Sequence, residues 1–207
     1  QYESRGLDKN NRELGRIYRL RWLNNKLGSQ PNMLSLTNAD LVPLLAHPNG
    51  WWRDTARRLL VQRRDRSIIP AITSLASNHF DHRARINALW TLEGLQAINA
   101  TSIFAGFSDS HIKVKLAAIE LSTRLPKIEH EAISEHFLRM APSNYQLALQ
   151  IALVAGELDS KLALQALKLV INKFDTQPWI HQAAISGLNG REKEFAKTLG
   201  KDVSSSF

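Results

Sequence analysis

Hydrophobic residues recur at helical spacing through most of the chain after residue 37. The clearest case is the stretch 49–64, where an apolar stripe runs beside a stripe of arginines. Pro48 blocks a helix before this stretch, and Asn49 can cap the free N–H groups of its first turn. One helix with one apolar stripe is not stable alone in water, so the pattern predicts partner helices that cover it. The stripe comprises Trp52, Ala56, Leu59 and Leu60.

The same periodicity, bounded by capping residues and by proline or glycine stops, predicts ten further helices. They form hairpins, and the second helices of the hairpins align at intervals of 30 to 35 residues. A period in this range with two helices per unit is typical of an α-solenoid. We therefore predict an all-α fold, a solenoid of five helical hairpins and a final capping helix. The ten ranges are 39–47, 65–77, 81–97, 101–107, 110–125, 130–140, 143–158, 159–174, 177–188 and 191–199.

Within this alignment, a small residue usually follows the first apolar position of the second helix by four residues. A small side chain there lets neighbouring helices approach closely. Leu149 is the departure from the pattern. The aligned first positions are Trp52, Ala84, Val114, Tyr145 and Ile180, and the positions four residues later are Ala56, Ala88, Ala118, Leu149 and Ala184.

The N-terminal part of the chain has a different pattern. Residues 15–23 alternate polar and apolar side chains, which predicts a strand, and residues 28–32 read as a linker. We predict an N-terminal extended segment and linker at 1–37, a helical domain at 38–200 and a tail at 201–207. Since the first residue is Gln1 and no signal-peptide pattern follows, we expect a piece of a longer protein.

Composition narrows the chemistry. The chain lacks cysteine, which excludes disulfides, thiolate metal sites and covalent Cys-x-x-Cys-His haem in these residues. No apolar run approaches the length of a membrane span, so we expect no transmembrane segment. The net charge is +8, and residues 1–66 carry 13 Lys/Arg against 6 Asp/Glu, a net +7. A one-ended basic field of this kind can attract nucleic acid, anionic lipid or an acidic protein partner.

Three stretches resemble known repeat proteins. Residues 109–118 resemble the HEAT repeat consensus, which places an Asp before a Val–Arg pair and a small residue; Lys115 stands where Arg is usual. The solenoid is therefore expected to be of the HEAT or armadillo type. Residues 47–60 and 84–95 resemble the HEAT segment of large extracytoplasmic proteins described as membrane-bound dehydrogenase-like. In that family a β-propeller similar to glucose/sorbosone PQQ-type dehydrogenases precedes the segment, and a c-type cytochrome domain often follows it. Residues 15–20 look like the closing strand of such a propeller.

The resemblance implies a non-catalytic scaffold in a periplasmic redox protein. Its partners would be the neighbouring propeller and cytochrome domains, and the parent would hold PQQ and haem c. No catalytic, cofactor-binding or metal-binding residue carries over to this chain. Two alternatives stay open: a basic HEAT-like nucleic-acid binder similar to alkylpurine DNA glycosylases, and a free-standing adaptor that binds a peptide along the solenoid groove.

The second helices carry a candidate interaction surface. Basic residues at corresponding places could form a ladder that docks an anionic partner. The alternative is local pairing, because Asp54 and Arg58 stand at i,i+4. His79, Asp81 and His82 suggest a metal site, but helical metal pairs prefer i,i+4 and a third ligand is lacking. The candidate surface comprises Trp51, Arg53, Arg57, Arg64, Arg85 and Lys115.

Overall fold

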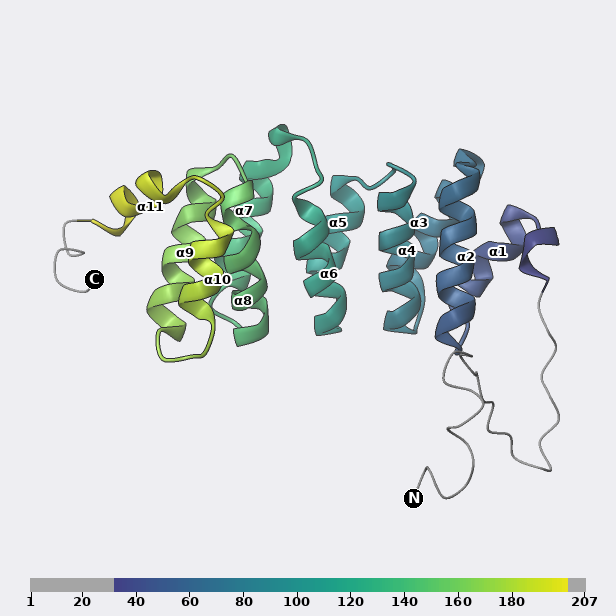
Figure 1. Ribbon diagram of the computed structural model, residues 1–207, viewed down its shortest axis with the longest axis horizontal. Helices are drawn as coiled ribbons and strands as arrows, with labels where there is room; N and C mark the ends of the chain where they lie inside the picture. The colour runs from purple at the N-terminus through teal and green to yellow at the C-terminus, as the bar shows by residue number, and fades with distance from the viewer. Residues whose placement is uncertain (1–31, 201–207) are drawn as a thin grey trace, which may run out of the picture. The chain divides into compact units, whose positions relative to one another are not determined.

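A computed structural model describes residues 32–200, which form eleven α-helices and contain no strand (Figure 1). The all-α prediction is therefore confirmed for this part of the chain. The predicted strand at 15–23, most of the linker and the tail at 201–207 lie outside the described residues. Residues 33–200 belong to one compact unit. Met33 itself is buried and its short 3₁₀ turn, Met33–Ser35, contacts the second helix.

Each predicted helix corresponds to one observed helix. Most begin after a polar residue whose side chain accepts a free N–H of the first turn, as Asn49 does for Trp51 and Asp81 for Arg83. Short 3₁₀ turns precede or extend several helices. The helices are α1 Asn38–Leu44, α2 Gly50–Arg63, α3 Ile69–Asn78, α4 His82–Gly94, α5 Ala100–Phe107, α6 Ile112–Ser122, α7 His130–Met140, α8 Tyr145–Val154, α9 Lys161–Phe174, α10 Ile180–Gly187 and α11 Glu192–Leu199.

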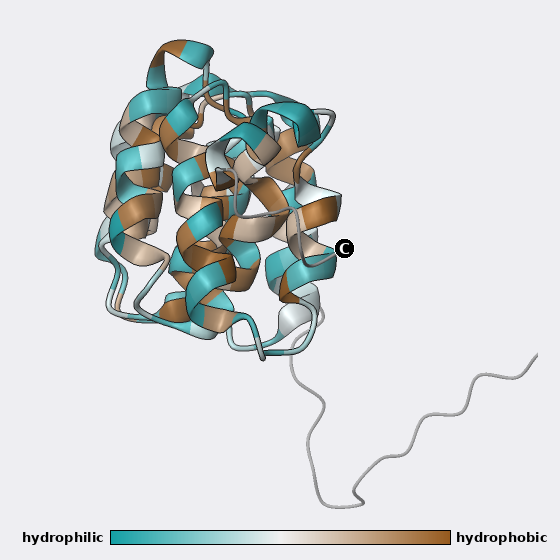
Figure 2. Ribbon diagram, turned by 90° about the vertical axis from the view of Figure 1, so that its left-hand side faces the viewer, coloured by the Kyte–Doolittle hydropathy of each residue, from teal (hydrophilic) through white to brown (hydrophobic). Residues whose placement is uncertain are grey.

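Helices α2, α4, α6, α8 and α10 contact one another in series, while α1, α3 and α5 each pack on the helix that follows them. Helix α7 instead packs mainly on α9 and only slightly on α8, so the fourth predicted hairpin does not form a closed pair. Apolar residues lie mainly between the helices and polar residues mainly on the outer surfaces (Figure 2). The small residues expected at the close contacts are buried: Ala56, Ala88, Ala118 and Ala184 are at most 2% exposed.

The fourth hairpin differs from the predicted alignment. Its second helix is capped by Asn144, so the positions three and seven residues after the cap are Leu147 and Ile151. These two residues are buried, whereas Leu149 is only partly buried. The cap therefore places this helix two residues away from the register that the apolar pattern suggested, and Leu149 is not the close-contact position.

Candidate functional site

The loop before α2 has a compact hydrogen-bonded structure. The Nδ1 of His47 accepts the N–H of Asn49, and Asn49 caps the helix. Four residues after the cap, the Arg53 guanidinium reaches back and donates to the carbonyls of His47 and Pro48, at 2.7 and 2.9 Å. The arginine thereby ties the first turn of the helix to the loop that precedes it.

The loop before α4 repeats this arrangement and adds an ion pair. His79 accepts the N–H of Asp81, and Arg85 donates to the carbonyls of His79 and Phe80. Arg85 also forms two hydrogen bonds to the carboxylate of Asp109, at 2.7 and 2.8 Å.

Arg85 therefore does not belong to an exposed ladder of basic residues, which corrects the sequence-based expectation. It is only 8% exposed. The reason is that the loop before α6 carries Asp109 in the place that His47 and His79 hold in the two earlier loops. Its carboxylate accepts the N–H of His111 and attracts the guanidinium of Arg85 into the contact between the two hairpins.

The other predicted surface residues are at least partly accessible. Trp51 is 58% exposed, whereas Trp52 packs against the core and stacks on His47, with ring centroids 4.4 Å apart. Arg57 and Lys115 are partly exposed. Arg64 is exposed and ends α2 in the left-handed conformation, with a φ of 54°.

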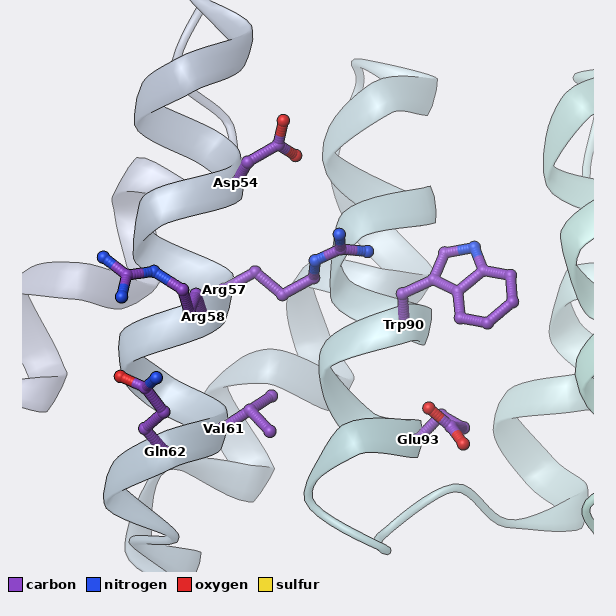
Figure 3. Close-up of a pocket in the computed structure, with 7 residues that line it drawn as sticks. All are labelled: Asp54, Arg57, Arg58, Val61, Gln62, Trp90 and Glu93. Atoms are coloured by element: carbon purple, nitrogen blue, oxygen red, sulfur yellow. The ribbon is translucent and has the colours of Figure 1, made fainter.

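A groove of about 550 Å³ lies between α2 and α4 (Figure 3). The two helices run in the same direction. In this view Asp54 lies above Gln62 on α2, and Trp90 lies above Glu93 on α4. The lining residues are Asp54, Arg57, Arg58, Val61, Gln62, Trp90 and Glu93. The side chain of Arg57 extends from α2 across the groove toward Trp90 on α4.

One end of the groove is closed by direct helix contact. A Cβ atom at Gly94 would stand 2.6 Å from Cγ2 of Val61, so the absence of a side chain at residue 94 lets α4 approach α2 there. Larger side chains, among them Arg57 and Trp90, project from both helices elsewhere along the groove. The groove thus has an apolar wall, formed by Val61 and the indole of Trp90, with charged groups around it.

The charged groups of the groove are not used by the fold. The expected i,i+4 pair between Asp54 and Arg58 does not form, and neither does any ion pair of Arg57 or Glu93 with the described residues. Four charged side chains of the lining therefore lack an ion-pair partner in this part of the protein, and of the two arginines Arg57 points toward Trp90 while Arg58 points away from α4 (Figure 3). Such groups are available to bind another molecule at little structural cost.

Sequence reasoning singled out Arg57 but missed the groove as a unit. A signal was present, because Asp54, Arg57, Arg58, Val61 and Gln62 follow the i, i+3, i+4, i+7, i+8 spacing of one helix face. This second face lies beside the apolar stripe. The contribution of α4 depends on how the two helices pack, which no local pattern reports.

The histidines near α4 serve the fold. Asp81 holds Arg83 at 2.7 Å, and this hydrogen bond lowers the pKa of Asp81 to about 2. Within residues 32–200 no group of three or more His, Cys, Asp or Glu side chains is placed to hold a metal ion. His82 instead stacks face to face on His111, with ring centroids 3.6 Å apart and an interplanar angle of 5°. The stack joins the first turns of α4 and α6.

This stack predicts a pH-dependent stability. Partial desolvation, and then the proximity of His111, lower the pKa of His82 below its ordinary value of 6.5. The folded state therefore binds this proton less readily than the unfolded state. Its contribution to stability is complete above the ordinary pKa and is lost as the pH falls toward the lowered pKa. Urea unfolding at a series of pH values should show the free energy of unfolding decreasing across this window.

The matched variant for this prediction is His111→Asn, which keeps a capping side chain but removes the stacked ring. Its stability should depend less on pH than that of the wild type. Some dependence should remain, because burial, and then Arg139, lower the pKa of His136 in the same direction. Identical pH profiles for the two proteins would contradict the prediction.

Comparisons with known proteins place the chain in no family, since no family model, curated protein or solved structure matches it. Among the described helices, none combines the length and apolar character that crossing a membrane requires.

Proposed function

We propose that this chain is a non-catalytic repeat scaffold that binds another protein, or another domain of its own parent protein, through the groove between α2 and α4. The observation that carries the proposal is a groove lined by Trp90 and by charged side chains without ion-pair partners among the described residues, with Arg57 reaching across it toward Trp90. None of these groups contributes an ion pair to the described part of the fold, so each can pair with a binding partner. A partly exposed tryptophan in a groove ringed by charge is also typical of the centre of a protein interface.

The repeated packing supports a solenoid of the HEAT or armadillo type. Three successive loops share a capping geometry, with His47, His79 and Asp109 in equivalent places. The even-numbered helices from α2 to α10 contact one another in series, as the helices of stacked repeats do. We extend the proposal to a periplasmic dehydrogenase-like parent on the resemblance of residues 47–60 and 84–95, with its propeller or cytochrome domain as the partner.

The groove favours protein over nucleic acid as its occupant. Asp54 and Glu93 both line it, and their carboxylates would repel a phosphate backbone that ran along the groove. A protein partner can instead match both signs of charge. The nucleic-acid alternative predicts duplex binding that weakens steeply as salt rises.

Site-specific photo-crosslinking in the native host tests the proposal. A photoreactive amino acid at Gln62 of the full-length protein should crosslink to a polypeptide, and the crosslink should disappear when Arg57 is changed to Glu. The same photoreactive residue at Arg124, an exposed position just after the end of α6, serves as the control. A crosslink to the propeller or cytochrome domain supports the redox parent, and one to an unrelated protein supports the adaptor alternative. Absence of any polypeptide crosslink at residue 62 overturns the proposal.

A further inference from the structure

We propose that the segment bound in the groove is an acidic peptide in which an Asp or Glu stands beside an aromatic or large apolar residue. This inference rests on the proposed function and identifies the chemistry of the partner. The carboxylate would bind the guanidinium of Arg57, and the apolar side chain would pack on the indole of Trp90. Figure 3 shows the two receiving groups next to each other, one from each helix.

The charge on α2 selects an anionic partner. This helix contains four arginines and one aspartate, which gives it a net charge of +3. Arg53 and Arg63 donate only to uncharged oxygens, which are backbone carbonyls and the side-chain amide of Asn38. Arg57 and Arg58 have no ion-pair partner within the described residues. The groove lining itself is balanced, with Arg57 and Arg58 against Asp54 and Glu93, so the attraction for a carboxylate comes from the net charge of α2 and from the free guanidinium of Arg57.

The shape of the groove selects a polypeptide segment. Its volume, about 550 Å³, lies in the range of ligand sites, yet its walls come from only two helices, α2 and α4. A small molecule binds best where most of its surface is enclosed, whereas a peptide can lie along an open groove and insert single side chains. The close contact of Gly94 with Val61 ends the groove on one side, which limits the apolar insertion to the neighbourhood of Trp90.

The two carboxylates of the groove limit the acidity of the partner. Asp54 lies on one side of Arg57 along the groove, and Glu93 lies beyond Trp90 toward the other end (Figure 3). Each would repel a second acidic group and accept a hydrogen bond from a peptide N–H or a neutral donor. The matching segment is therefore one acidic residue with an adjacent aromatic residue and uncharged flanks, not a continuous acidic run.

Fluorescence anisotropy with four labelled synthetic peptides tests this inference. The first peptide carries a Glu–Phe pair between Gly and Ser flanks, and the others replace the Glu by Gln, the Glu by Lys, or the Phe by Ser. The full chain should bind the Glu–Phe peptide about tenfold or more tightly than each of the others, since a charge-assisted pair or a buried ring is lost in each. Arg57→Glu should abolish this preference, and Trp90→Ala should weaken binding by a similar factor.

Arg124→Glu makes the same charge change away from the groove and should bind like the wild type. Far-UV circular dichroism on each variant shows whether it is folded, so that misfolding is not mistaken for a loss of binding. Equal binding of all four peptides, preference for the Lys peptide, or no binding to any of them overturns the inference. Formation of a dimer that is lost in Arg57→Glu would assign the groove to a second copy of the chain and also overturn it. A crosslink at residue 62 combined with any of these results would leave the proposed function standing and remove only the acidic–aromatic partner.

Discussion

Replacing Arg85 by methionine is expected to lower the free energy of unfolding by about 3–5 kcal/mol, the usual cost of leaving a buried charge without its partner. Arg85 and Asp109 have side chains that are each 10% exposed, and two hydrogen bonds join them. Burial alone would raise the pKa of Asp109, but the bonds from Arg85 and from the backbone of His111 hold it below the ordinary value. Without the guanidinium, the carboxylate keeps its desolvation penalty and loses its largest compensation.

Arg53→Met is the matched control for this change. Arg53 makes the same pair of bonds to its loop carbonyls but binds no carboxylate, so its loss should cost only about 1–2 kcal/mol. Changing Asp109 to Asn in the Arg85→Met background should recover part of the loss, because the asparagine is neutral and still offers an oxygen to the N–H of His111. Urea unfolding followed by circular dichroism measures all four proteins. An equal loss of unfolding free energy in Arg53→Met and Arg85→Met would show that the ion pair with Asp109 does not contribute to stability.

The two arginines also mark the limit of prediction from sequence. Local signals placed the eleven helices correctly, because capping residues and breakers such as Asn49 and Pro48 act within a few residues of the helix start. The alignment of Arg53 with Arg85 was also correct, since both stand four residues after a cap. The alignment could not predict that Arg85 is buried while Arg53 remains partly exposed. This difference depends on Asp109, a residue of the next hairpin, and on the packing that brings the two together.

The groove shows the same division between local and tertiary information. One face of α2 carries Asp54, Arg57 and Gln62 at helical spacing, which the sequence displays openly. Whether Asp54 pairs with Arg58 or remains free depends on side-chain rotamers that the spacing does not determine. Trp90 joins these residues only because α4 packs parallel to α2 in one particular register. The register of the fourth hairpin was mistaken for a related reason: an apolar run fits several alignments, and the cap at Asn144 selects one.

Replacing Gly187 by alanine is expected to destabilise the C-terminal helices by about 2 kcal/mol. A Cβ atom at residue 187 would stand 1.9 Å from the carbonyl oxygen of Ala152 and 2.7 Å from the carbonyl carbon of Leu153, both backbone atoms of α8. Backbone atoms inside a helix cannot rotate away, so α8 and α10 would have to separate. Overpacking of this kind costs about 3 kcal/mol, and the better helix propensity of alanine returns about 1 kcal/mol.

Gly50→Ala provides the matched control for Gly187→Ala, because both glycines lie in helices but their surroundings differ. The nearest atom to a Cβ at residue 50 is the terminal nitrogen of Arg53 at 3.4 Å, close to an ordinary van der Waals distance and far longer than the backbone contacts at residue 187. Alanine at residue 50 should therefore leave the stability unchanged or raise it by up to about 1 kcal/mol. In thermal unfolding, Gly187→Ala should lower the melting temperature by about 4–8 °C, and Gly50→Ala should not lower it. A Gly187→Ala protein as stable as the wild type would mean that α10 does not pack against α8 at this distance, and the serial contact of the even-numbered helices would then end at α8.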